Sequence, residues 1–136
     1  MWQDWWEAHG PKGMTVPIFI EKVRALVGGG IFSEVCRMAK AGRMSFGTNP
    51  TVWGMDDGRG NLPACIAWAR GHTWKFVLHP DPGEDHEERK RLQDGPYKAF
   101  DELAALFGPG DTGRIAYSCW AWDNRTEIVK KLRAIS

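Results

Sequence analysis

The amino-acid sequence predicts an α+β fold, a single domain (residues 1–136) in which helices pack on one face of an antiparallel sheet. The first observation is length, because 136 residues with 43% hydrophobic side chains can form one core and are too few for two ordinary domains. The second is patterning, since segments with apolar residues at helical spacing alternate with short β-rich runs. The third is the Gly- and Pro-containing turns that separate these segments. The predicted order is helix, helix, three strands, helix, strand, helix.

The first elements are predicted to be two helices that follow a Trp-rich N-terminal segment, residues 1–16. Pro17 is tolerated in a first helical turn, and the apolar residues after it recur at helical spacing, so we expect a helix over 17–27. The glycine run 28–30 is expected to end it. A second helix is predicted from about residue 31 to residue 41.

The strands are predicted from β-rich composition. Residues 43–57 are expected to be extended around turns. The runs 64–69 and 73–78 are separated by a short segment that contains Gly71, which predicts an antiparallel hairpin. The aromatic-rich run 114–122 is predicted to be the last strand of the same sheet.

Two further helical elements are predicted in the C-terminal half, and the first of them consists of two pieces, 84–93 and 97–107. Residues 84–93 begin with acidic and end with basic side chains, as the helix dipole favours. Residues 97–107 carry an apolar stripe that is expected to pack on the sheet. The last helix, 125–135, follows Asn124, a residue type that favours the N-cap position.

Charge and hydropathy exclude several classes of protein. Eighteen basic and 17 acidic residues give a net charge of +1, so a broad, strongly basic nucleic-acid surface is not expected, although a local basic site is. No stretch approaches the ~20 apolar residues that a bilayer span needs, and we expect no membrane association. Residues 1–7 lack the basic and apolar regions of a signal peptide.

The three cysteines, Cys36, Cys65 and Cys119, are an odd number and lie far apart in the sequence. No C-x-x-C motif occurs, so a zinc knuckle and a dithiol redox motif are not expected. Unpaired cysteines favour a reducing compartment, and we expect a cytoplasmic, intracellular protein.

Eight tryptophans in 136 residues are more than a core of this size needs. An aromatic-rich core accounts for some of them. Exposed indoles stack on nucleobases or anchor protein interfaces, so others are expected to bind a partner. The predicted ligand-binding residues are Trp53, Trp74 and Trp120 for stacking, with Arg59, Arg70, Lys75 and Arg114 for phosphate.

Other motifs favour structural roles. The glycine run 28–30 lacks the preceding strand and the Gly-Lys-Ser/Thr ending of a phosphate loop, so a turn between helices is expected. The pair Asp56-Asp57 is expected to lie in a β-turn rather than to hold a cation. The cluster of His and acidic residues from His79 to His86 has no metal-binding helical spacing and no adjacent nucleophile motif. We therefore predict no cofactor, no metal site and no catalytic residue.

A series of elements over residues 43–136 has a recognisable order. They are Thr51-Val52-Trp53 before Asp56-Asp57, then Gly71–Val77, the helix 97–107, and Arg114-Ile115-Ala116 before Asn124-Arg125. This order resembles the mRNA cap-binding translation initiation factor family. The resemblance implies that Trp53 stacks on a base and that Arg114 contacts phosphate. The family has a Glu after its stacking Trp, where this sequence has Gly54, and its first stacking Trp has no counterpart here.

The leading functional hypothesis is a non-enzymatic binding module for a nucleotide or single-stranded nucleic acid. Residues 31–75 hold six basic and three acidic residues, whereas 81–102 hold four basic and eight acidic ones, so charge is polarised. The alternative is a small inhibitor or adaptor, of the kind that viruses and mobile elements encode, that binds a protein partner. Its interface would be the tryptophans of segment 1–16 and the acidic face 84–102. A third hypothesis is a hydrolase that uses the cluster from His79 to His86.

Overall fold

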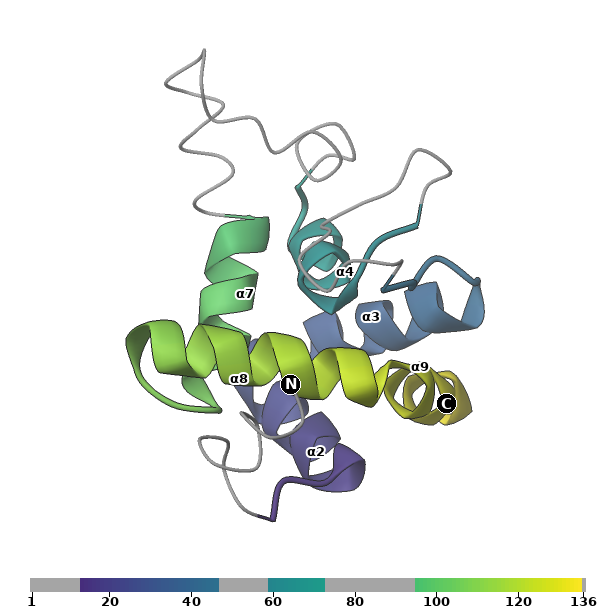
Figure 1. Ribbon diagram of the computed structural model, residues 1–136. Coiled ribbons are helices and arrows are strands. Elements are labelled where there is room, and N and C mark those ends of the chain that lie inside the picture. The colour runs from purple at the N-terminus through teal and green to yellow at the C-terminus, as the bar shows by residue number, and fades with distance from the viewer. Residues whose placement is uncertain (1–12, 47–58, 73–94, 136) are drawn as a thin grey trace.

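The computed structural model describes residues 13–46, 59–72 and 95–135, which form six α-helices (Figure 1). In chain order they are α2 (Val16–Val27), α3 (Gly29–Lys40), α4 (Leu62–Ala69), α7 (Pro96–Ala105), α8 (Gly110–Asp123) and α9 (Arg125–Ala134). Each helix packs against the next one in this order, and α9 returns to pack against α2 and α3. The helices therefore form a closed ring around one hydrophobic core.

The predicted α+β class is wrong. In the ranges that the structure describes, the chain is helical, and the only β pairing is an isolated parallel bridge between Met44 and Gly60. The predicted antiparallel sheet has no counterpart there. Its strand at 43–57 is represented among described residues only by the short extended stretch that holds this bridge.

The predicted hairpin over 64–78 is also wrong, because its first arm is helix α4. The side chain of Asn61 caps this helix by accepting a hydrogen bond from the backbone N–H of Ala64 at 3.1 Å, and Pro63 lies in the first turn. Nearly every residue of α4 is buried. A short run that is apolar on all sides has the same pattern as a buried strand, so periodicity could not identify it. The second arm, 73–78, lies outside the described residues.

The predicted strand over 114–122 is the middle of helix α8. Its β-forming aromatic residues suggested a strand. Its buried residues nevertheless have helical spacing, because Trp120 lies four residues after Ala116 and three after Tyr117. Gly113 allows α8 to begin so close to α7. A Cβ atom at this position would lie 2.0 Å from the carbonyl oxygen of Gly108 and 2.6 Å from that of Ala104.

Four predicted helices are confirmed, with small shifts of their ends. Helix α3 begins two residues earlier than predicted, at Gly29. The turn predicted over residues 28–30 is confirmed only at Gly28, which has a φ of +88°, because Gly29 and Gly30 belong to α3. The confirmed pairs are 17–27 with α2, 31–41 with α3, 97–107 with α7, and 125–135 with α9. The predicted helix 84–93 lies outside the described residues.

An aromatic cluster fills the centre of the core. The ring of Phe19 is fully buried, and its centroid lies 4.9 Å from that of Trp120 and 5.8 Å from that of Phe107. Tyr117 packs beside them, with its ring centroid 5.5 Å from Phe107. These side chains join α2, the turn that follows α7, and α8, so α8 is held by aromatic contacts along its inner face.

The hydroxyl of Tyr117 is buried in this cluster and finds no hydrogen-bond partner among the described residues. Burial raises the pKa of this phenol, which therefore stays neutral. We expect Tyr117→Phe to leave the free energy of unfolding unchanged or to raise it by about 1 kcal/mol, since an unpaired buried hydroxyl is removed. Urea unfolding with an unchanged m-value measures this. A loss of stability above about 1 kcal/mol would reveal a hydrogen bond at this hydroxyl.

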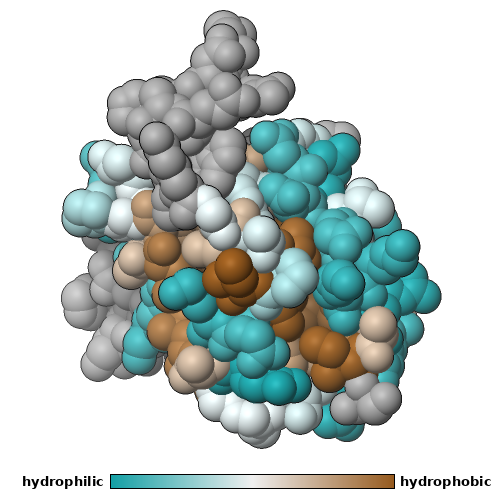
Figure 2. Space-filling view, turned by 90° about the horizontal axis from the view of Figure 1, so that it is seen from below, coloured by the Kyte–Doolittle hydropathy of each residue, from teal (hydrophilic) through white to brown (hydrophobic). Residues whose placement is uncertain are grey.

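The outer surface carries few large apolar side chains. Among described residues they are Ile18 in α2, 45% exposed, and Ile115 in α8, 39% exposed. Figure 2 views the molecule from the side on which α2 lies and shows hydrophobic residues as patches among hydrophilic ones. None of the helices in the described part of the chain combines the length and the apolar character required to cross a bilayer.

Candidate cationic groove along α9

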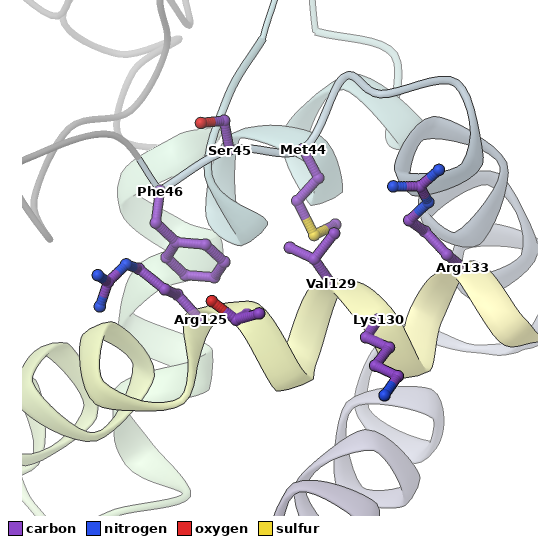
Figure 3. A pocket seen from close by; sticks show the side chains of 8 residues that line it. Met44, Ser45, Phe46, Arg125, Val129, Lys130 and Arg133 are labelled. Atoms are coloured by element: carbon purple, nitrogen blue, oxygen red, sulfur yellow. The ribbon is translucent and has the colours of Figure 1, made fainter.

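A groove of about 600 Å³ lies between helix α9 and the extended segment 44–46, and we call it the α9 groove (Figure 3). Its described lining residues are Met44, Ser45, Phe46, Arg125, Thr126, Val129, Lys130 and Arg133. Three of these are cationic and none is acidic. The groove therefore combines positive charge with an apolar floor, a combination that suits a ligand with both phosphate and apolar surfaces.

Segment 44–46 is the wall of the groove, and backbone hydrogen bonds fix its position. The N–H of Ser45 donates to the carbonyl oxygen of Gly60 at 2.8 Å, and the N–H of Gly60 donates to that of Arg43 at 2.8 Å. Gly60 directly precedes Asn61, the N-cap of α4. Met44 and Phe46 are each only 5% exposed, so the wall is also anchored by burial.

Helix α9 is the other wall, and its core contacts set which side chains face the groove. Ile128 and Leu132 are fully buried against the core. This orientation places Arg125, Val129 and Arg133, which are spaced by four residues, along the groove. Figure 3 shows Arg125 and Arg133 at opposite ends, with Met44 and Val129 facing each other between them.

The cations of the α9 groove differ in how they are held. The guanidinium of Arg125 lies over the indole of Trp122, 3.8 Å from the ring centroid, and its Nη1 donates to the Trp122 carbonyl oxygen at 2.6 Å. Lys130 and Arg133 form no ion pair within the described residues. The neighbouring Lys131, outside the groove, reaches Glu127 at 4.0 Å. The described lining of the groove therefore has positive charge and no carboxylate.

A second hollow, of about 440 Å³, lies beside α3 and contains three cations, Arg24, Arg37 and Lys40. Two of them are already paired, because Arg24 lies 3.7 Å from Glu21 and Arg37 forms an ion pair with Glu34. These carboxylates offset much of its positive charge. The α9 groove is therefore the stronger candidate for an anion.

The structure places Trp120 in the core and not at a binding surface. Trp120 is 3% exposed, and its indole packs on the rings of Phe19 and Phe107. A buried indole has no free face for a base, so Trp120 does not join the candidate site. The predicted ligand-binding residues Trp53, Trp74 and Lys75 lie outside the described residues.

The predicted phosphate contacts that are described occupy different places. Arg114 donates to Asp101 at 3.0 Å and to Asp111 at 2.8 Å, and these hydrogen bonds raise the pKa of its guanidinium.

Arg70 forms two hydrogen bonds with the carboxylate of Glu102, at 2.8 and 2.9 Å. Both arginines thus join helices within the protein. Arg59 is exposed and precedes Gly60 of the β-bridge.

The remaining sequence candidates contribute little to the described surface. The cluster from His79 to His86, the pair Asp56-Asp57 and the tryptophans of segment 1–16 lie outside the described residues. Within the residues that are described, no three His, Cys, Asp or Glu side chains come together as a metal site would require. The described part of the acidic face 84–102 includes Asp101 and Glu102, which are engaged by Arg114 and Arg70.

Sequence reasoning missed the cationic residues of α9. The signal was present, because residues 125–134 hold four basic residues and one acidic residue. The spacing of Arg125, Val129 and Arg133 also places them on one helical face, away from Ile128. What the sequence could not reveal is that segment 44–46 lies opposite that face.

Comparison with known proteins adds no functional assignment, since no family model, curated protein or solved structure matches this chain. The resemblance to cap-binding factors stays a prediction. One of its elements, Arg114-Ile115-Ala116, lies in helix α8.

Proposed function

We propose that this protein is a non-enzymatic binding module for a nucleotide or single-stranded nucleic acid, and that the ligand's phosphates bind in the α9 groove. The observation that carries the proposal is the set of three cations, Arg125, Lys130 and Arg133, with no acidic residue among the described lining. Charge of this kind attracts phosphate, and sequence-independent nucleic-acid binding depends on it.

The fixed position of Arg125 supports the proposal. Its stacking on Trp122 and its hydrogen bond to the Trp122 carbonyl hold the guanidinium in one place before any ligand arrives. Arginine has five N–H donors, so others remain for a phosphate. A cation that is already ordered loses less conformational entropy on binding.

The cysteines support a binding role in a reducing compartment. Burial raises the pKa of all three thiols, that of Cys65 to about 12. A protonated thiol is a weak nucleophile, so none of the three is suited to covalent catalysis. All three are buried and unpaired. We therefore propose a cytoplasmic, intracellular location, where thiols persist.

A matched pair of variants on α9 tests the function. Lys130 lines the groove, and its neighbour Lys131 is also exposed but faces Glu127 outside it. Lys130→Gln and Lys131→Gln remove the same charge at adjacent positions. We expect Lys130→Gln to weaken binding of a fluorescein-labelled oligouridylate of roughly eight nucleotides several-fold and to lower the salt slope by about 0.7, while Lys131→Gln changes neither.

Fluorescence anisotropy at two salt concentrations measures both quantities. Equal effects of the two variants would show that net charge and not the α9 groove binds the oligonucleotide. No binding of nucleotides or oligonucleotides by the unaltered protein would overturn the proposal. Binding of an acidic peptide under the same conditions would instead favour the protein-partner alternative.

A further inference from the structure

We propose that the ligand of the α9 groove is a single nucleic-acid strand, of which three to four nucleotides lie along α9, and not a mononucleotide. This inference rests on the proposed function and specifies the ligand class of the same groove. It is carried by the separation of the two arginines and by the apolar floor between them.

The two arginines stand far apart along the helix. Arg125 and Arg133 are eight residues apart in α9, which at 1.5 Å per residue separates them by about 12 Å along the axis. Stacked nucleotides of one strand advance about 3.4 Å each, so this span corresponds to roughly three to four nucleotide steps. A nucleoside monophosphate has one phosphate and can reach only one of the two guanidinium groups.

The ends of the groove both favour phosphate. Arg125 is held at one end by Trp122, and Arg133 at the other forms no ion pair among the described residues. Lys130 lies between them on α9 and lines the groove, and Figure 3 shows its side chain directed away from segment 44–46. A nucleoside triphosphate concentrates its negative charge at one end, whereas a strand distributes phosphates along the whole row of cations. The row therefore matches a strand better than a triphosphate.

The floor between the cations is apolar. Met44, Phe46 and Val129 line it, and Figure 3 shows Met44 and Val129 facing each other there. Met44 and Phe46 are each only 5% exposed, so the partly exposed Val129 is the main apolar contact, and it suits a sugar or a base edge that a single strand can turn toward the protein. A duplex keeps its bases stacked and paired, so it presents mainly phosphate and sugar. The groove thus favours a single strand over a duplex.

The groove offers little means of reading a base sequence. Asn and Gln, which read adenine, and Asp and Glu, which read cytosine, are absent from its described lining. Arginine and lysine can read guanine, but in this proposal the cations of the groove are assigned to phosphates. The hydroxyls of Ser45 and Thr126 are the uncharged polar groups of that lining, and a hydroxyl bonds equally to several bases. We therefore infer binding that depends on strand length and not on sequence.

A length series tests this inference in the full chain. Uridine monophosphate, the oligouridylates of two to six nucleotides, uridine triphosphate and a duplex are titrated by calorimetry at low salt. We expect the affinity to rise about tenfold from two to four nucleotides. Beyond four nucleotides the affinity should rise only because a longer strand can occupy the groove in more than one alignment. An adenylate tetramer is expected to bind within about threefold of the uridylate tetramer.

An end variant links the length dependence to the groove. Arg133→Gln should reduce the affinity of the tetramer to nearly that of the dimer, while Lys131→Gln leaves the series unchanged. If monophosphate, triphosphate and tetramer bind equally well and Lys130→Gln still weakens them, the strand is excluded but the phosphate site stands. Equal affinity for the duplex also overturns the single-strand inference. Absence of all binding overturns the proposed function itself.

Discussion

Replacement of Trp120 by alanine is expected to lower the free energy of unfolding by about 3–5 kcal/mol. The indole lies at the centre of the aromatic cluster, 3% exposed, with ring contacts to Phe19 and Phe107. Its loss leaves a cavity between α2 and α8 that surrounding residues can only partly fill. Urea unfolding followed by far-UV circular dichroism measures the change, because the signal does not depend on the removed indole.

Trp122 provides the matched control for this substitution. It lies two residues away in α8 and is only partly buried, where its indole supports the guanidinium of Arg125. Trp122→Ala is expected to cost only about 1 kcal/mol and to weaken oligonucleotide binding instead. If Trp120→Ala left stability intact and abolished binding, the core position of Trp120 would be refuted and the stacking role predicted from the sequence restored.

Gly113→Ala is expected to destabilise the protein by about 3 kcal/mol, at the upper end of the effects of overpacking. A Cβ atom here would overlap the carbonyl oxygens of Gly108 and Ala104, at 2.0 and 2.6 Å. Both oxygens belong to the backbone, so no side-chain rotation can make room for the methyl group. Helix α8 would have to move away from the end of α7, which weakens the packing of Tyr117 on Phe107.

The control for Gly113 is Gly30, a glycine of helix α3 at which an added Cβ atom would meet no atom within 4 Å among the described residues. Gly30→Ala is expected to raise stability by up to about 1 kcal/mol, because alanine favours the helix and meets no neighbour. Thermal unfolding of both variants gives opposite shifts of Tm. A stabilising effect of Gly113→Ala would contradict the close approach of α7 and α8.

The sequence predicted the helices that have one apolar face and one polar face. Helices α2, α3, α7 and α9 each bury one side, and hydrophobic periodicity located all four. It failed for α4 and α8, whose buried residues surround much of the helix. In α4 the apolar residues lose their period, whereas in α8 the buried residues keep helical spacing but the aromatic residues suggested a strand. Tertiary burial, which a single sequence does not contain, decides between the two.

The candidate site was not located by the sequence. A local basic site with aromatic support was expected from eight tryptophans and from the basic excess of residues 31–75, whereas the cations of the α9 groove are Arg125, Lys130 and Arg133. The individual residues differ, because Arg114 and Arg70 have carboxylate partners from other helices. These ion pairs join residues that are 13 and 32 positions apart in the sequence, so no local sequence pattern predicts them. Free cations can be told from paired ones only in three dimensions.

The parallel bridge between Met44 and Gly60 couples the groove to the stability of helix α4. Gly60 leads directly into the cap of α4, so opening the start of this helix would also release the groove wall. The amide hydrogens of Ser45 and Gly60 are therefore expected to open together, and they should show equal protection factors against exchange with solvent deuterium. A ligand seated against the wall would slow the exchange of both amides together. Binding in the groove would in this way strengthen an element that the ligand never touches.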